Sequence, residues 1–165
     1  MQTGNNLSKN GIWRDFRSPA TYSWSGSSKD NYLSGKGILK VFSNGKLWKE
    51  YNGEMVDGRM HGYGELVDFH YKYTYKGNWQ NGKENGEGEL QDDLGEVHVI
   101  GKFKGTFKNG EEWNGSGYNH VRGHNYSFYD GEYSKSVQTS KTTSSSDNSS
   151  SSSDDEDAKY EKIEH

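Results

Sequence analysis

The chain has 165 residues and a formal net charge of −4. Only 28% of its residues are hydrophobic, yet 14% are aromatic, and it contains 22 glycines, one proline and no cysteine. Glycine costs about 1 kcal/mol per helical position relative to alanine, so this composition disfavours a helix bundle. It also lacks the long Val, Ile and Leu runs of a parallel α/β sheet, and without cysteine a disulfide framework is excluded. Two classes remain: a disordered protein, or a β architecture built from aromatic rings and tight turns.

Neither a membrane-spanning helix nor a secretory signal is indicated. No apolar run approaches the 18 or so residues that a membrane-spanning helix needs, and residues 1–11 hold no apolar segment typical of a secretory signal. We therefore expect a cytoplasmic protein that is not secreted, with peripheral association at a membrane or the cytoskeleton as an alternative.

Residues 1–21 precede the repeated pattern and are assigned as an N-terminal arm or cap. From residue 22 to residue 135 a pattern recurs in copies that begin near residues 24, 51, 75, 103 and 129. The first four copies alternate an aromatic residue with glycine, as a half-buried strand does, and return through a Gly-x-Gly segment, whereas the fifth stops after Tyr133. The positions that define the pattern are Trp24, Gly26, Gly35, Gly37, Tyr51, Gly53, Gly62, Gly64, Tyr75, Gly77, Trp79, Gly86, Gly88, Phe103, Gly105, Phe107, Gly115 and Gly117.

The turns inside the copies favour tight β-hairpins. Three copies turn at a dipeptide that supplies the positive φ of such a turn, namely Asp57-Gly58, Asn81-Gly82 or Asn109-Gly110. Residues 38–42 and 47–51 predict a further hairpin between two copies. The paired glycines of the returning strand are expected to leave room for the rings of the neighbouring hairpin.

A single hairpin is marginally stable in water, whereas stacked hairpins share one core. Residues 22–135 are therefore expected to form an all-β, single-layer solenoid of stacked antiparallel β-hairpins. Six rings are expected in its core: Trp24, Tyr51, Tyr75, Trp79, Phe103 and Phe107. Three tryptophans outside the repeat frame, Trp13, Trp48 and Trp113, are expected to cap the array or to contact a partner.

Residues 136–165 have a different composition. Ten of these 30 residues are serine, and they carry the entire net charge of −4, because the first 135 residues are neutral. Such a segment cannot bury enough apolar surface to offset its conformational entropy, so a disordered tail is predicted. Ser151, Ser152 and Ser153 each have an acidic residue three positions on, which resembles a casein-kinase-2-type phosphorylation site. A merely solubilising tail is the alternative.

The copy at residues 75–90 reads Tyr-x-Gly-x-Trp-x-x-Gly-x-x-x-Gly-x-Gly-x-Leu and resembles the MORN repeat (membrane occupation and recognition nexus). The copy at residues 51–66 departs from that consensus at Met55. The resemblance spans roughly residues 22–133 and implies a fold of stacked hairpins. It also implies a scaffold or dimerisation module, found at membranes and cytoskeletal structures or beside catalytic domains. The flanks are too short for such a catalytic domain, so no enzyme is expected.

Other chemistry is weakly indicated. The Gly-x-Gly pairs lack the third glycine and the helix of a dinucleotide fingerprint. His120 and His124 lie around a glycine in a predicted loop rather than on a helix, so a zinc site is not expected. The pairs Glu111-Glu112 and Asp92-Asp93 adjoin glycine-rich turns and are expected to be solvated, which gives no reason for a raised pKa. No catalytic, cofactor or metal site is therefore predicted.

Residues 69–79 interleave aromatic residues with lysines. In an alternating strand, Phe69, Tyr71, Tyr73 and Tyr75 share the core face and the lysines face solvent, so this is interpreted as an amphipathic strand. The neutral charge of the array also argues against a groove that follows phosphates, and no nucleic-acid partner is expected.

The expected partner is another protein or a second copy of the chain, giving a homodimer. The open strand edges at the two ends of the array are natural sites for strand addition. The alternative is a peripheral membrane adaptor that binds anionic phospholipid headgroups through Lys102, Lys104 and Lys108, which alternate along one predicted strand.

Overall fold

The structure is a computed structural model that describes residues 2–5, 20–92, 101–120 and 122–135. The predictions made for Trp13, for the tail at residues 136–165 and for Ser151, Ser152 and Ser153 lie outside the described residues. The described residues form the all-β fold that the sequence predicts. Its strands are β1 (Gln2–Asn5), β2 (Ala20–Trp24), β3 (Ser27–Lys29), β4 (Tyr32–Ser43), β5 (Lys46–Val56), β6 (Arg59–Asp68), β7 (Tyr73–Gln80), β8 (Lys83–Asp92), β9 (Lys102–Lys108), β10 (Glu111–Asn119), β11 (His124–Tyr129) and β12 (Glu132–Lys135).

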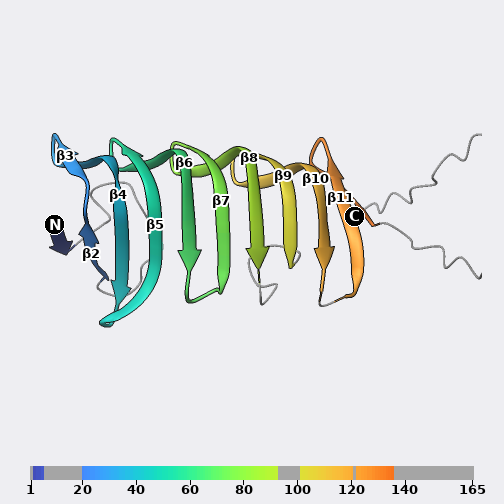
Figure 1. Cartoon of the computed structure of the whole chain (residues 1–165), viewed down its shortest axis with the longest axis horizontal. Coiled ribbons are helices and arrows are strands. Elements are labelled where there is room, and N and C mark those ends of the chain that lie inside the picture. The colour runs from blue at the N-terminus through green and yellow to red at the C-terminus, as the bar shows by residue number, and fades with distance from the viewer. Residues whose placement is uncertain (1, 6–19, 93–100, 121, 136–165) are drawn as a thin grey trace, which may run out of the picture.

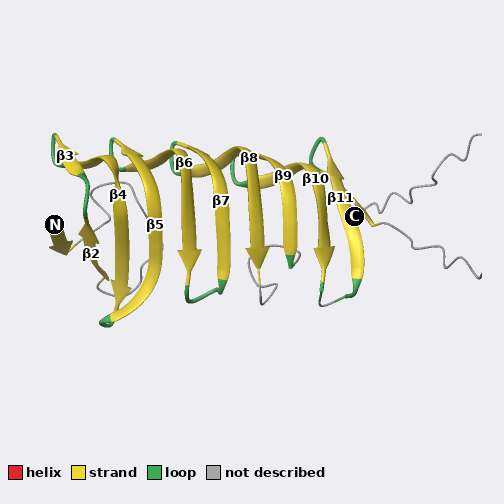
Figure 2. Cartoon of the chain, viewed as in Figure 1, coloured by secondary structure: helices red, strands yellow, loops and turns green. Residues whose placement is uncertain are grey.

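The strands form one sheet, and each hydrogen-bonds to its neighbour in antiparallel fashion. They follow chain order across the sheet, except that β3 pairs only with β4 (Figure 1). No helix covers either face of the sheet in the described part of the chain (Figure 2). One strand comes from the predicted arm, because β1 adds itself to the edge of β2. The single-layer array of antiparallel hairpins is thus confirmed.

The connections lie at the two ends of the strands, along the two long sides of the sheet (Figure 1). We call the side with the turns after β5, β7 and β9 the tip edge, and the side with the connections after β4, β6 and β10 the base edge. The tip edge carries the tight turns between β5 and β6, β7 and β8, and β9 and β10. Asp57 and Gly58, the central residues of the first turn, have φ of 48° and 74°. The other two turns repeat this left-handed pair at Asn81-Gly82 and Asn109-Gly110. The hairpin turns predicted from these dipeptides are confirmed.

A single row of apolar side chains crosses the sheet. The strand register aligns one large residue from each strand, so that neighbouring hairpins share contacts rather than forming separate cores. From β2 to β9 the row contains Trp24, Leu39, Tyr51, Leu66, Tyr75, Leu90 and Phe103. Every member of this row is buried, as are Trp79 and Phe107. The rings that the repeat pattern placed in the core are therefore all inside it.

The strands bend sharply beside this row. In a flat strand, residues four apart lie about 13 Å from each other. The rings of Tyr75 and Trp79, on the same strand, have centroids only 4.9 Å apart, and those of Phe103 and Phe107 are 5.3 Å apart. The tip half of each hairpin is thus folded back over the base half. The core lies on the inner side of this bend, and a single-layer sheet can therefore bury large rings on one face.

Glycine makes the bend possible. A row of glycines crosses the sheet next to the apolar row and is here called the glycine crease. It consists of Gly37, Gly53, Gly64, Gly77, Gly88, Gly105 and Gly115. A Cβ added to Gly64 would lie 2.6 Å from the Tyr51 ring, because that ring rests on the backbone there. Tyr51 also donates its hydroxyl proton to the Glu54 carbonyl oxygen at 3.0 Å.

One packing prediction needs correction. The glycines of the returning strand were expected to make room for rings of the neighbouring hairpin. In two hairpins the structure places the ring of the same hairpin on them instead: Tyr51 of β5 covers Gly64 of β6, and Tyr75 of β7 covers Gly88 of β8. The bend explains this contact, because a ring next to the glycine crease lies on the returning strand of its own hairpin. Gly117 of β10 is covered as predicted, by Tyr126 of the next hairpin.

We expect Gly77→Ala to lower the free energy of unfolding by about 3 kcal/mol, as severe overpacking does. The added Cβ would lie 2.5 Å from the Gly88 Cα and 2.6 Å from the Glu87 carbonyl oxygen, both of which are backbone atoms. Urea unfolding measures the change. The matched control is Gly45→Asn, since Gly45 has φ of +74° with no atom within 4 Å, and asparagine tolerates that backbone. Equal costs for the two variants would contradict a tightly packed crease.

The buried phenols predict loss of stability at alkaline pH. Burial raises the pKa of Tyr51 from 10.0 to about 12, and burial also raises the pKa of Tyr73, Tyr75 and Tyr126. Because these pKa values are higher in the folded state, the fold is fully stabilised below pH 10 and loses that stability as the pH rises toward 12 and above. Absorbance titration should show these four among the 12 tyrosines ionising late, together with unfolding. One ionisation step near pH 10 with the fold intact would contradict this.

Candidate functional site

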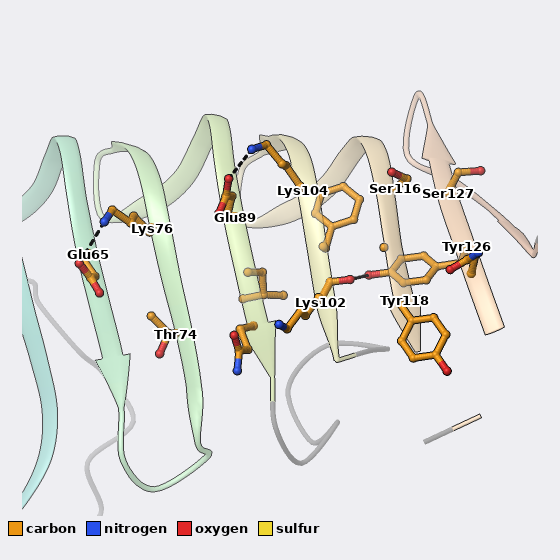
Figure 3. A pocket seen from close by; sticks show the side chains of 15 residues that line it. Glu65, Thr74, Lys76, Glu89, Lys102, Lys104, Ser116, Tyr118, Tyr126 and Ser127 are labelled. Atoms are coloured by element: carbon orange, nitrogen blue, oxygen red, sulfur yellow. Dashed lines mark hydrogen bonds and ion pairs between the residues drawn. The ribbon is translucent and has the colours of Figure 1, made fainter. Parts of the chain in front are cut away.

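The face opposite the core, here called the outer face, is polar and electrostatically balanced. One register row reads Glu65, Lys76, Glu89, Lys104 and Ser116 across β6 to β10. Lys76 pairs with Glu65 at 3.7 Å, and Lys104 pairs with Glu89 (Figure 3). These groups are exposed, so each pair contributes little to stability. Their alternation nevertheless leaves this part of the surface without a net charge.

A shallow hollow of about 910 Å³ lies on the outer face over β6 to β11. Figure 3 shows the two ion pairs side by side and Tyr118 toward the base edge. The lining consists mostly of side chains with hydroxyl, amide or charged groups, and the strand backbone lies between them. It comprises Glu65, Thr74, Lys76, Glu89, Leu90, Gln91, Lys102, Phe103, Lys104, Ser116, Gly117, Tyr118, Asn125, Tyr126 and Ser127. The hollow suits an extended polar ligand rather than a buried small molecule.

The three lysines considered for lipid headgroups differ in their contacts. All three are exposed on β9. Lys104 is paired with Glu89, and the Lys108 ammonium lies 3.8 Å from the centre of the Trp113 ring. Lys102 lines the hollow next to Gln91 and Tyr118 in the register. Trp113 is thus part of a cation–π contact at the tip edge.

The base edge holds a buried ion pair that the sequence pattern did not reveal. Asp68, the last residue of β6, is fully buried, and its Oδ2 lies 2.7 Å from the Lys49 ammonium. Its Oδ1 accepts the backbone N–H groups of His70 and Tyr71 at 2.9 and 2.8 Å. Asp68 therefore fixes the loop between β6 and β7.

The same position recurs in the following hairpins. Asp92 ends β8 and Asn119 ends β10, and both are buried. The expectation that Asp92 is solvated was therefore wrong, because this position faces the core at the end of the returning strand. The Oδ1 of Asn119 accepts the Arg122 N–H at 2.8 Å, as Asp68 does in its own loop. The available signal was spacing, because Asp68 and Asp92 each stand two residues after the repeat leucine. A polar residue at that point marks the end of the returning strand.

The strand predicted over residues 69–79 is shorter than expected. β7 begins at Tyr73, and residues 69–72 form a turn in which Lys72 has φ of 54°. Phe69 and Tyr71 are consequently 48% and 39% exposed, whereas Tyr73 and Tyr75 are buried. The physical reason is Asp68, whose hydrogen bonds end the ladder before the aromatic alternation does.

Trp48 lies beside this turn at the base edge. Its ring meets His70 edge-on at 4.9 Å, and His70 meets Tyr71 at 4.7 Å. The Trp48 carbonyl oxygen accepts the Phe69 N–H at 2.8 Å. Trp48 thus packs against its own chain while remaining partly exposed.

The C-terminal end of the sheet leaves part of the core exposed. Phe128 and Tyr133 pack against the core but are only partly buried. β12 hydrogen-bonds to β11 alone and has no strand on its other side among the described residues. At the N-terminal end β1 pairs with Thr21–Trp24 of β2, its own outer side has no strand among the described residues, and Ala20 and Tyr22 are likewise only partly buried. The C-terminal end therefore combines an open strand edge with partly exposed rings.

The two histidines considered for a zinc site have different surroundings. His120 is exposed, and the Nε2 of His124 lies 3.0 Å from the Tyr133 hydroxyl, so these two side chains have separate surroundings. No group of three His, Asp or Glu side chains suited to a metal ion occurs in the ranges that the structure covers. Within the same ranges, no helix has the length and apolar character to cross a bilayer.

Comparison with known proteins identifies the repeats. The model of the MORN repeat family matches residues 51–68 and 75–93, which correspond to β5–β6 and β7–β8 with their tip turns. No curated protein matches the chain. The flanking hairpins share the register, the glycine crease and the apolar row of the two matched copies. The chain is therefore a MORN-repeat protein.

Proposed function

We propose that this protein is a non-catalytic scaffold that binds protein by strand addition at the C-terminal end of its array, in the first instance a second copy of itself. The observation that supports this most directly is the open edge of β12. The Tyr129–Glu132 pair closes a two-residue turn, and such a pair is hydrogen-bonded in a tight hairpin. Because pairing alternates along an antiparallel ladder, the N–H and C=O groups of Tyr133 and Lys135 point away from β11.

The partly exposed rings beside that edge favour the same interaction. A strand that paired with β12 would satisfy the outward backbone groups and would also cover Phe128 and Tyr133. The end of a second array offers the same edge and the same rings, so a two-fold pairing of β12 with β12 would continue both sheets and both cores. A second copy of this chain is therefore the simplest partner for the open edge of β12.

An anionic membrane is the alternative partner, and the electrostatics of the array support it less. Lys104 is neutralised by Glu89, and Lys108 is held over Trp113. Flotation with phosphoinositide-containing vesicles compares the two partners. Salt-sensitive binding that Lys102→Glu, Lys104→Glu and Lys108→Glu together abolish would overturn the protein scaffold as the main function.

Light scattering at two protein concentrations about a hundredfold apart tests self-association, because mass action favours the dimer at the higher one. The mass should rise from 18.7 kDa toward twice that value. Lys135→Pro should remain monomeric, since proline removes an outward N–H without disturbing the β11 ladder. Lys135→Ala, which removes the same charge but keeps the N–H, should behave like the wild type. A wild-type monomer at both concentrations would contradict self-association.

A further inference from the structure

Charge is segregated in the last two hairpins. Over residues 101–135 the carboxylates of the described residues all lie near the tip turns, at Glu111, Glu112, Asp130 and Glu132. On the base side of the glycine crease β9 and the loop between β10 and β11 carry Lys102, Lys104 and Arg122, all exposed, and these strands have no described carboxylate there. We call these three residues the basic end surface.

The basic end surface overlaps the C-terminal part of the hollow. Lys102 and Lys104 line it together with hydroxyl and amide groups from β10 and β11. Those groups include Ser116, Tyr118 and Asn125. Hydroxyl and amide N–H groups donate hydrogen bonds to carboxylates or phosphates, and a lysine ammonium supplies the complementary charge. Two carboxylates also line the hollow: Glu65 pairs with Lys76, and Glu89, on the adjacent strand β8, offsets the charge of Lys104.

We infer that the acidic run at residues 154–157 of this same chain docks on the basic end surface as an intramolecular ligand. That run reads Asp-Asp-Glu-Asp, and the segment that contains it carries the whole net charge of −4, while residues 1–135 are neutral. The two partners therefore have opposite charge, although the array as a whole has none. This contact is independent of the strand pairing proposed for β12.

The length of the connection favours the chain's own tail over a separate acidic protein. Residue 154 lies 19 positions after Lys135, the last residue of β12. A flexible chain of that length spans about 24 Å on average, whereas β12 and β9 are three strand spacings apart, about 14 Å. The acidic run is thus held near the surface at an effective concentration on the order of 1 mM.

Docking gives the serines before the acidic run a regulatory role. Ser151, Ser152 and Ser153 directly precede it. Each phosphate would add about −1.5 to −2 charges next to the docked carboxylates. Phosphorylation would therefore tighten the contact and withhold the hollow from other anionic ligands.

The test compares amide NMR spectra of the full chain with those of a variant in which Asp154→Asn, Asp155→Asn, Glu156→Gln and Asp157→Asn neutralise the run. At about 20 mM salt we expect shift differences at the amides of Lys102, Lys104, Ser116 and Arg122, and none on β4 or β5. These differences should be lost at about 500 mM salt, because the charges are exposed and screened. Spectra without differences on β9 to β11 would overturn the inference.

Two further arms separate the tail from other occupants. Spectra recorded at two protein concentrations should agree, and differences that grow with concentration would overturn the intramolecular form of the contact. A peptide spanning residues 151–160, added to the tail-neutral variant, should shift the same amides as the attached tail does, because it carries the same acidic run. No response of those amides to the peptide would overturn the inference. Lys29→Gln with Lys36→Gln, two exposed lysines at the far end of the sheet, is the control and should leave the tail contact unchanged.

Discussion

Tyr75→Ala is expected to lower the free energy of unfolding by about 4 kcal/mol, the cost of removing a fully packed ring from a core. Tyr75 is 0% exposed, and its ring meets those of Trp79 and Phe107, each with centroids 4.9 Å apart. Because one contact lies within its own hairpin and the other in the next, the cavity would loosen two repeats at once. Chemical denaturation of the purified protein measures the change.

Two other variants give this prediction its controls. Tyr75→Phe keeps the ring and removes only the hydroxyl that donates to the Asn78 carbonyl oxygen at 3.0 Å, so it should cost about 1 kcal/mol. Tyr129→Ala removes a ring of the same kind that is 77% exposed and should change stability by less than about 0.5 kcal/mol. If Tyr75→Ala cost no more than Tyr129→Ala, the shared ring core would be contradicted.

Asp68→Ala is also expected to destabilise the protein by about 4 kcal/mol, because it leaves the Lys49 ammonium buried without its carboxylate. The Asp68 side chain is 0% exposed and that of Lys49 only 11%. The same change removes the acceptor for the His70 and Tyr71 N–H groups, so the base loop should also lose its order. Thermal unfolding reports the first effect, and hydrogen exchange at these two amides reports the second.

Conservative variants separate the two roles of Asp68. Asp68→Asn keeps an oxygen for the loop amides but removes the charge, so it should destabilise the sheet without freeing the loop. Adding Lys49→Met to Asp68→Asn should restore most of the lost stability, since the uncompensated charge is then gone. Failure of that double variant to recover stability would show that the ion pair is not what Asp68 contributes.

The repeat pattern predicted the parts of the fold that depend on local chemistry. Asp-Gly and Asn-Gly pairs specify left-handed turns such as Asp57-Gly58 wherever they occur. Alternation of a ring with glycine specifies which face of a strand is buried, and Tyr51 and Tyr75 are buried accordingly. Each signal lies within a few residues of the turn or strand that it determines, so neither depends on how neighbouring strands pair.

Features that depend on register or on backbone pairing could not be predicted in this way. The Lys49–Asp68 pair requires a shift in the β5–β6 register between Asn52 and Glu54, and nothing local encodes that shift. The bend of the strands at the glycine crease could not be predicted either, because a period-two pattern is the same in a straight strand and in a bent one. β1 escaped prediction because residues 2–5 carry no apolar alternation and join the sheet through their backbone.

The open edge of β12 is the basis of the proposed function, and hydrogen exchange at the Tyr133 and Lys135 amides tests it most directly. Both N–H groups point away from β11 in the single chain, so at low protein concentration they should exchange at the rate of unprotected amides. At high concentration strand addition should protect both, while the Ser134 amide, which faces β11, should stay protected throughout. Unprotected exchange at Tyr133 and Lys135 at every concentration would contradict a scaffold that assembles through this edge.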